Sequence, residues 1–533
     1  MEVHIRTAIP DDAKEVAYVL NKEHDIRMIH TKPSLRILLV ALFLGWIVDL
    51  LFYNKIPGIS VPLFVLLLTA ALFGLGQLEG LLPLRRNLWL LLPLFFFATM
   101  VFVRANIFVT SLNLAFCLML TGHVVHFYAA DKIEKLGLTG YALIPLRVAV
   151  NALIRTGTLV SSSFDVKAMS QRGRNLLPLV RGILLALPVL VVFIALLSSA
   201  DIIFADYLEK VLKLDLLSHL PELLWRGVII LTATWFVAGG LAYAFSRGTA
   251  SGEEGISENT PEEASVSSPK IISLGFIETA TVLTLVNLLF LVFVAIQFAY
   301  LFGGHANIIG EDFTYAEYAR RGFFELLAVS MLSLCLILGF QWLGRRETIR
   351  RKRIFGCLCS VMVGLVLVIL ASAFQRLRLY EATYGYTQLR LYSHIFMIWL
   401  AAVFVWLVFV LWSRPSRFGI GAFIAALGFL ITLNIINPDD FIVKRNLAHY
   451  QSTGRLDISY LGILSEDAVP ALISAMDKVT REEQKALRRN LSGRLKRMDE
   501  NTRWQSWPSF HLSRRRTHKS LQSISTSHRL RDL

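Results

Sequence analysis

Two apolar runs that flank a short basic segment decide the fold: GFFELLAVSMLSLCLILGFQWL at residues 322–343 and IFGCLCSVMVGLVLVILASAF at residues 354–374. Each run has about the 20 residues that a helix needs to cross the hydrocarbon core of a bilayer. Between them, residues 345–353 carry six Lys or Arg side chains, and such clusters favour the cytoplasmic side of a membrane. The stretch therefore predicts a helical hairpin that crosses a membrane twice and turns in the cytoplasm.

The composition of the whole chain agrees with a protein that lies in a membrane. Of its 533 residues, 55% are hydrophobic and only 17% are charged, whereas soluble domains are about 25% charged. The formal net charge of +15 is typical of basic loops that lie in the cytoplasm and contact anionic lipid headgroups. We therefore expect the lipid bilayer, and no nucleic acid, to be the partner of the basic side chains.

Apolar runs of similar length recur on both sides of this stretch and make about eleven spans in total. They predict an all-α fold: a polytopic transmembrane helical bundle with a small helical C-terminal extramembrane region. The predicted division is 1–34, a cytoplasmic N-terminal arm; 35–128, a first transmembrane group of four spans; 129–177, a basic cytoplasmic loop; 178–245, a transmembrane pair; 246–270, a flexible linker; 271–436, a second transmembrane group of five spans; 437–511, a helical C-terminal region; and 512–533, a disordered tail.

The topology follows from this division. An odd number of spans places the N-terminus in the cytoplasm and the C-terminus outside it, in a multi-pass protein of the cell (cytoplasmic) membrane. The last hundred residues hold many basic groups that would favour the cytoplasm, but long domains cross the membrane largely regardless of their charge. Residues 141–156 are expected to form an amphipathic helix on the membrane surface; if they span instead, the later spans reverse direction.

Cysteine usage and short motifs indicate no cofactor. The four cysteines all lie inside apolar runs, with neither a disulfide framework nor zinc-type spacing. The sequence also contains no phosphate-binding glycine-rich loop, nucleophile elbow, zinc-protease helix or dinucleotide fingerprint. We therefore expect no cofactor and no metal, and we favour a role without enzymatic activity.

The predicted topology brings four polar segments, far apart in the sequence, to the outer face of the membrane. One interpretation is a pocket in which Arg side chains bind an anionic group, because the guanidinium fork matches phosphate and carboxylate geometry. The other is that these charges pair among themselves and hold helix ends together. The candidate residues are Asp201, Tyr315, Glu317, Tyr318, Arg320, Arg321, Glu325, Arg376, Arg378, Tyr384, Thr387, Arg390, Asn437, Asp439 and Arg445.

The same segments resemble a bacterial membrane family of unknown function, DUF4173, which has a sister family, DUF4153. The resemblance runs from about residue 170 to 515, with the second transmembrane group as its core. It implies a multi-pass protein of the bacterial cell envelope and brings no activity with it. The motifs that carry it are Ser199–Asp201, Tyr315–Phe323, Tyr384–Arg390, Asn437–Asp439, Leu456–Asp457, Tyr460–Leu461, Asp467–Leu472 and Trp507.

Three functions remain open. The first is a non-enzymatic transport, sensing or scaffold component that binds an anionic ligand or an envelope partner protein. The second is a membrane enzyme that acts on a lipid-linked or anionic envelope substrate, for which Glu317 or Glu325, Arg378 or Arg390, and Asp439 should converge in one open pocket. The third is a secondary transporter, which should have a cavity at mid-depth lined by Asn287, Asn434 or His394.

Overall fold

The computed structural model describes residues 35–129, 133, 136–163, 220–253, 275–302, 323–343, 348–413, 417–504 and 506–526. These ranges are helical and contain no strand. Eleven helices within them are long and apolar enough to cross a membrane, which confirms the all-α polytopic fold. They begin with Leu35–Phe52 and continue with α2 Ser60–Leu78, η1 Arg85–Leu90 joined to α3 Leu91–Val103, α4 Ile107–His126, α5 Leu138–Ser163, α10 Leu220–Glu253, α11 Phe276–Phe302, α13 Phe323–Leu343, α14 Ile349–Tyr384, α15 Gln388–Trp412 and α16 Phe418–Ile436.

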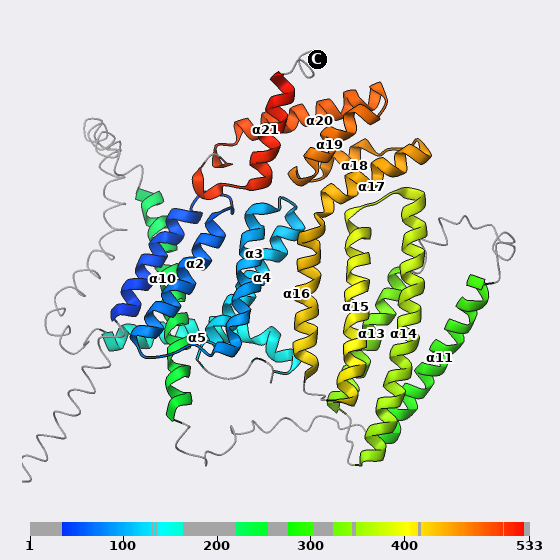
Figure 1. Cartoon of the computed structure of the whole chain (residues 1–533). Coiled ribbons are helices and arrows are strands. Elements are labelled where there is room, and N and C mark those ends of the chain that lie inside the picture. Colours follow the sequence, from blue (N-terminus) through cyan, green and yellow to red (C-terminus); the bar gives the residue numbers. More distant parts are fainter. Residues whose placement is uncertain are drawn as a thin grey trace, which may run out of the picture.

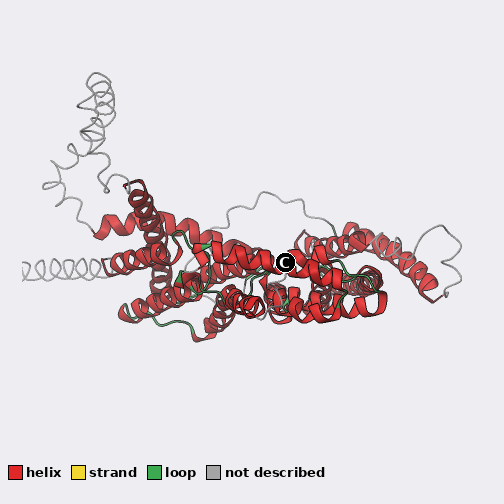
Figure 2. Cartoon of the chain, turned by 90° about the horizontal axis from the view of Figure 1, so that it is seen from above, coloured by secondary structure: helices red, strands yellow, loops and turns green. Residues whose placement is uncertain are grey.

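Most of these helices stand side by side, and their ends lie at two levels (Figure 1). The turns before α2, between α3 and α4, and between α14 and α15 lie at the upper level, beneath the C-terminal helices. The basic start of α14, residues 350–353, lies at the lower level. Seen from above, the bundle is elongated (Figure 2). The C-terminal region and the strongest basic cluster therefore lie at opposite ends of the bundle.

Helix α5 differs from the others because it runs across the lower part of the bundle (Figure 1). Its two faces differ in burial, as is typical of an amphipathic helix. The buried face carries Tyr141, Ile144, Val148, Ala152 and Thr156, and the exposed one Leu143, Leu146, Val150, Leu153 and Ile154. The exposed face is apolar, and the helix is also long and apolar enough to cross a membrane, so the surface helix expected at residues 141–156 stays a prediction. The basic loop expected at 129–177 thus contains a long helix, and the span expected at 178–204 lies outside the described residues.

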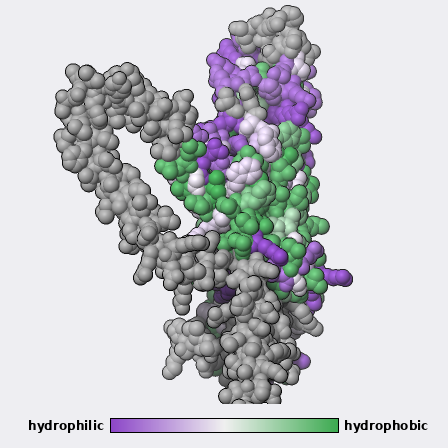
Figure 3. Space-filling view, turned by 90° about the vertical axis from the view of Figure 1, so that its left-hand side faces the viewer, coloured by the Kyte–Doolittle hydropathy of each residue, from purple (hydrophilic) through white to green (hydrophobic). Residues whose placement is uncertain are grey.

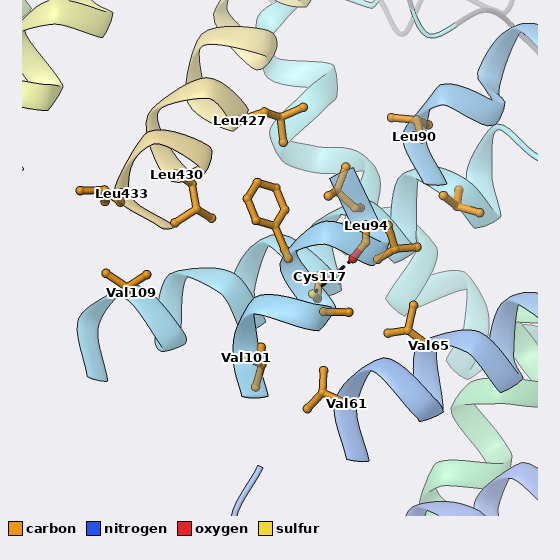
Figure 4. Packing of buried hydrophobic residues seen from close by; sticks show 14 of the residues in the cluster. Val61, Val65, Leu90, Leu94, Val101, Val109, Cys117, Leu427, Leu430 and Leu433 are labelled. Atoms are coloured by element: carbon orange, nitrogen blue, oxygen red, sulfur yellow. Dashed lines mark hydrogen bonds between the residues drawn. The ribbon is translucent and has the colours of Figure 1, made fainter. Parts of the chain in front are cut away.

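Two hydrophobic cores hold the helices together, and they meet at α15 and α16. One joins α11, α13, α14 and α15. The other joins α2, α3, α4, α5, α10 and most of α16, and it continues into the C-terminal region. Figure 4 shows part of this second core, where Val61 and Val65 of α2 and Leu94 of α3 pack in the same cluster as Leu427 and Leu430 of α16. Helix α16 therefore packs against α15 of the second transmembrane group and also joins that group to α3, α4 and α5.

Residues 437–526 form a helical layer over the upper end of the bundle, which we call the cap (Figure 1). In Figure 3, polar residues gather over this end, above a band of apolar residues. Helix α21 shows that the disordered tail expected at 512–533 is wrong for residues 512–526, because Thr517 and Leu521 are each only 1% exposed. The cap consists of α17 Pro438–Thr453, α18 Ile458–Ile463, η7 Glu466–Ala468, α19 Val469–Ala475, η8 Met476–Lys478, α20 Arg481–Glu500, η9 Thr502–Trp504, η10 Trp507–Ser509 and α21 Leu512–Thr526.

The first residues of the linker expected at 246–270 belong to a helix. Helix α10 continues to Glu253, well past the last apolar residues of its span. Residues 254–274 lie outside the described ranges.

Candidate functional site

A cleft lies between the upper end of the bundle and the cap, with a volume of about 910 Å³. Its floor comes from the α3–α4 turn and the start of α15, and its other walls come from α18, η7 and α20. The cleft is lined by Ala105, Asn106, Ile107, Phe108, Ser111, Gln388, Gly462, Ile463, Leu464, Ser465, Glu466, Asn490, Arg494, Arg497, Met498 and Trp504. Polar groups and apolar side chains thus line one space at the end of the membrane bundle.

Asp439 is the centre of a hydrogen-bond network beneath this cleft. Its side chain is 0% exposed. Asn106 Nδ2 donates to both carboxylate oxygens at 3.0 Å, Gln388 Nε2 donates at 2.6 Å, and the Ser465 amide donates at 3.0 Å. A buried side-chain oxygen needs hydrogen-bond donors, and both carboxylate oxygens of Asp439 have them. Asp439 therefore joins α4, α15 and the cap through neutral partners and not through another charge.

Asp467 makes a second connection from the cap to the same turn. Its Oδ2 accepts hydrogen bonds from the amides of Ala105 at 2.8 Å and Asn106 at 3.3 Å. Burial raises the pKa of Asp467 above its ordinary value, and hydrogen bonds from Ser513 and Ala105 act in the opposite direction. The α3–α4 turn is thus held by two buried carboxylates, each on a different helix of the cap.

Arg494 supports the wall of the cleft. It is 9% exposed, and its guanidinium donates to the carbonyl oxygens of Gly462 at 2.6 Å, Leu464 at 2.7 Å and Ser465 at 3.3 Å. These carbonyls follow the last turn of α18, where backbone acceptors lack partners within the helix. Burial lowers the pKa of Arg494. Arg494 therefore holds the wall in place, whereas the guanidinium of Arg497, also in the lining, is exposed.

Arg390, the predicted anion-binding residue at the start of α15, lines a different pocket, with a volume of about 410 Å³. Its guanidinium lies 4.2 Å from the ring centroid of Tyr380 and donates to the carbonyl oxygens of Tyr384 and Gly385. It thereby caps the end of α14. The pocket is lined by Phe323, Phe324, Leu377, Tyr380, Thr387, Leu389, Arg390 and Ser393.

The convergence expected for the enzyme is therefore not found among the described residues. Asp439 is enclosed in its network, whereas Arg390 lines the separate pocket, and neither Glu325 nor Arg378 contributes to that lining. Glu325 lies exposed in the first turn of α13, and Arg378 is exposed on α14. The structure places these candidates on one end of the bundle but not in one pocket.

The other described candidates have local roles. Arg376 donates to Gln297 Oε1 at 3.2 Å, and the Arg445 guanidinium lies 5.2 Å from the Phe441 ring centroid. Asn437 joins α16 to α17 with a left-handed backbone, φ 55°, a conformation that asparagine tolerates better than most residues. Six candidates lie outside the described residues: Asp201, Tyr315, Glu317, Tyr318, Arg320 and Arg321.

Polar side chains inside the bundle contact neighbouring helices, as buried polar groups in membranes usually do. The pairs are Asp49 with Arg226 at 2.6 Å, Asn113 with Asn434 at 2.9 Å, Asn287 with the Leu358 carbonyl at 3.0 Å, and Glu381 with His394 at 3.1 Å. The mid-depth groups named for a transporter are thus engaged in contacts between elements of the bundle. No group of three or more potential metal ligands occurs in the described part of the chain.

Sequence reasoning missed Asn106 and Arg494, and it included Gln388 and Asp467 only as parts of motifs, without a role at a site. Asn106 had a readable signal, because it lies directly before an apolar helix, and its side chain accepts a hydrogen bond from the Val109 amide as a helix cap. Ser465 and Asp467 form a similar capping pair before η7. Arg494 lies in a helix with many basic residues, and nothing in the sequence separates it from its neighbours.

These features define a polytopic α-helical membrane protein with a helical cap over one end. Its sequence matches the family described as Domain of unknown function (DUF4153) over residues 91–475, and the chain belongs to that family. The match is to the sister of the family DUF4173 named from the motifs, and it begins in the first transmembrane group, earlier than expected. Searches of curated proteins and of solved structures return no match.

Proposed function

We propose that this chain is a non-enzymatic transport, sensing or scaffold component of the bacterial cell envelope, and that its cleft binds an anionic ligand or an envelope partner protein. The observation that carries the proposal is the cleft of about 910 Å³ between bundle and cap. Its volume is in the range of known ligand sites. The exposed guanidinium of Arg497 supplies a cation that no carboxylate of the described chain neutralises by an ion pair.

The rim of the cleft supports a ligand or partner that also has an apolar part. Ile107 and Ile463 are 82% and 78% exposed, and Phe108 is 47% exposed. Ile107 and Phe108 begin α4, so they lie where the apolar band of the bundle ends. A charged group beside exposed apolar side chains is typical of sites for amphiphilic ligands and partner surfaces.

The contacts inside the bundle favour sensing or scaffolding over transport. Asn434 and His394, named above for a transport cavity, are held by Asn113 and Glu381. Opening a path through these helices would break those contacts. Asp439 and Asp467, in contrast, connect the cap to the α3–α4 turn. A change in the position of the cap when a ligand binds in the cleft can therefore reach that turn.

We further propose that the cap is extracytoplasmic, that the N-terminus lies in the cytoplasm, and that the membrane is the cytoplasmic membrane. The basic start of α14 lies at the end of the bundle away from the cap, and such clusters favour the cytoplasm. Labelling of intact cells with a membrane-impermeant thiol reagent tests this orientation. Cysteines at positions 382 and 460 should react and one at position 350 should not, whereas the reverse pattern would invert the topology.

The alternative, an enzyme acting on a lipid-linked or anionic envelope substrate, has one observation in its favour. Glu466 contributes a half-buried side chain to the cleft, and a carboxyl group there could act as a general acid or base. The cleft is the place where such a substrate would bind. Glu466→Gln would then abolish turnover without abolishing binding.

The binding proposal is tested with a photo-crosslinking amino acid at position 463, in the cleft, and at position 507, which is 59% exposed elsewhere on the cap. We expect a discrete adduct at position 463 that Arg497→Glu removes. The matched control is Lys496→Glu, because Lys496 is 79% exposed and pairs only distantly with Glu500, at 3.9 Å. Equal adducts at both positions, or an adduct that Arg497→Glu leaves unchanged, would refute a specific site in the cleft.

A further inference from the structure

A second pocket of about 310 Å³ lies between the end of α20 and the start of α21. It shares Met498 and Trp504 with the cleft, but its other lining residues are different. Phe510 in its wall accepts a backbone hydrogen bond from Ile59 at 3.0 Å, which places the pocket against the turn before α2. The pocket therefore lies at the junction of cap and bundle, next to the membrane-spanning helices.

Two guanidinium groups in this pocket are each stacked on an aromatic ring. Arg514 lies 5.0 Å from the ring centroid of Trp504, and Arg515 lies 5.4 Å from that of Phe510. Stacking occupies the face of a guanidinium and leaves the N–H groups along its edge available for a planar, bidentate acceptor. Two consecutive residues of the chain thus each place an oriented guanidinium donor in the pocket.

The Arg514 guanidinium has no hydrogen-bond acceptor among the described residues. Its Nε and Nη1 atoms are buried without a partner, and the Trp504 Nε1 donor beside them is also unsatisfied. Glu466 and Asp467 attract Arg514 only at longer range, and burial lowers the pKa of its guanidinium. Burying charged donors without acceptors is costly, and an anionic acceptor would remove that cost.

The remaining charges of the pocket do not supply that acceptor. Asp499 is engaged with His518, at 2.7 Å between Oδ1 and Nε2. His511 donates from Nε2 to the Arg104 carbonyl oxygen, 3.2 Å away, and its Nδ1 accepts from the Arg514 backbone amide at 3.5 Å. Both histidines and the one carboxylate of the lining therefore have partners already.

We propose that this pocket is a binding site for a phosphate group, held by the guanidinium edges of Arg514 and Arg515. Three or four oxygens on one phosphorus match two forked donors. The group can come from a lipid headgroup, since the pocket lies at the junction of cap and bundle, or from a free phosphate. The site is independent of the cleft proposal, because neither arginine lines the cleft.

The test uses the purified full chain in a phosphate-free maltoside detergent and follows thermal unfolding. One arm adds inorganic phosphate against chloride at equal ionic strength, and the other adds phosphatidylglycerol. Arg514→Gln should weaken the stabilising ligand about 10- to 100-fold, the loss expected for a charged hydrogen bond. Arg489→Gln is the control, because Arg489 is exposed on α20 and lies outside the pocket.

Stabilisation by inorganic phosphate that Arg514→Gln abolishes would support a site for the free anion. Stabilisation by phosphatidylglycerol alone, with the same dependence, would assign the site to a headgroup. Arg515→Gln provides a second variant if Arg514→Gln does not fold, since Arg515 is exposed. The proposal is overturned if neither ligand stabilises the protein, or if all variants respond alike.

Discussion

Replacing Asp439 by alanine should detach the cap from the bundle more than any other change to a single acidic residue of α17. The substitution leaves the Asn106 amide, the Ser465 amide and the Gln388 side chain without their shared acceptor. A buried donor without a partner costs about 1–3 kcal/mol. Gln388 is half-buried and can bind water, so the other two donors dominate, and we expect a loss of about 2–6 kcal/mol in the free energy of unfolding.

The neighbouring residue gives a matched control. Asp440 lies in the same turn of α17, and its side chain is 23% exposed and pairs with Lys444 at 2.7 Å. An ion pair of this kind, with an exposed lysine, contributes about 0–1 kcal/mol. Asp440→Ala removes the same charge from the same helix end, so any larger effect of Asp439→Ala comes from the buried network.

The chain carries its own reporters for the assay. Cys117 and Cys359 are buried, whereas Cys335 and Cys357 are exposed, so unfolding can be followed by thiol labelling after the two exposed cysteines are replaced by serine. For a cooperative unit of 150–250 residues, 3 kcal/mol corresponds to a fall in Tm of roughly 6–12 °C. Equal midpoints for the two alanine variants would refute the reasoning, because the four contacts to Asp439 would then add nothing.

Two further predictions follow from single side chains. Arg390→Ala should lower the folded yield of the protein far more than Arg350→Ala, because Arg390 caps α14 and stacks on Tyr380 whereas Arg350 is exposed. Equal yields of the two variants in an expression and size-exclusion assay would count against this prediction. Burial lowers the pKa of His511 from 6.5 to about 4. The unfolded state therefore binds more protons between these values, and stability should decrease by about 3 kcal/mol as the pH falls from 6.5 to 4. His511→Gln, measured by unfolding at several pH values, should lack this part of the slope.

The architecture could be predicted from the sequence because membranes impose one strong rule. Every membrane-spanning helix must form its backbone hydrogen bonds within itself and must expose apolar side chains to lipid. Runs such as residues 354–374 can therefore be predicted as spans without knowledge of their neighbours. The sequence predicts less well which other helices a span packs against. Helix α16 packs against α15, which precedes it in the sequence, but Leu427, Leu430 and Leu433 also lie in the core formed by α2, α3 and α4. No periodicity within residues 418–436 indicates this second set of partners.

The predicted outer-face site stays a prediction, but the contacts of its residues show what sequence reasoning could not find. Asp439 was chosen because it follows a span, and it does lie at the junction of bundle and cap, but its partners Asn106 and Ser465 come from segments 333 and 26 residues away. Pairing over such distances depends on tertiary structure and leaves no local pattern. The disordered tail expected at residues 512–533 was wrong for α21 for a related reason. This helix has few apolar residues, and it is ordered because Leu521 and Thr517 are buried against other parts of the protein.

The distribution of satisfied and unsatisfied groups separates structure from function in this cap. Asp439, Asp467 and Arg494 are buried and have several partners each, which is what residues that fix a fold require. Arg514 has buried donors without acceptors, whereas Arg497, on the same small domain, is exposed and forms no ion pair with a carboxylate of the described chain. Burying charged donors without acceptors is costly, so an anion would stabilise Arg514, whereas Arg497 offers an accessible cation. We therefore expect a ligand to bind at these two arginines and not at the carboxylates.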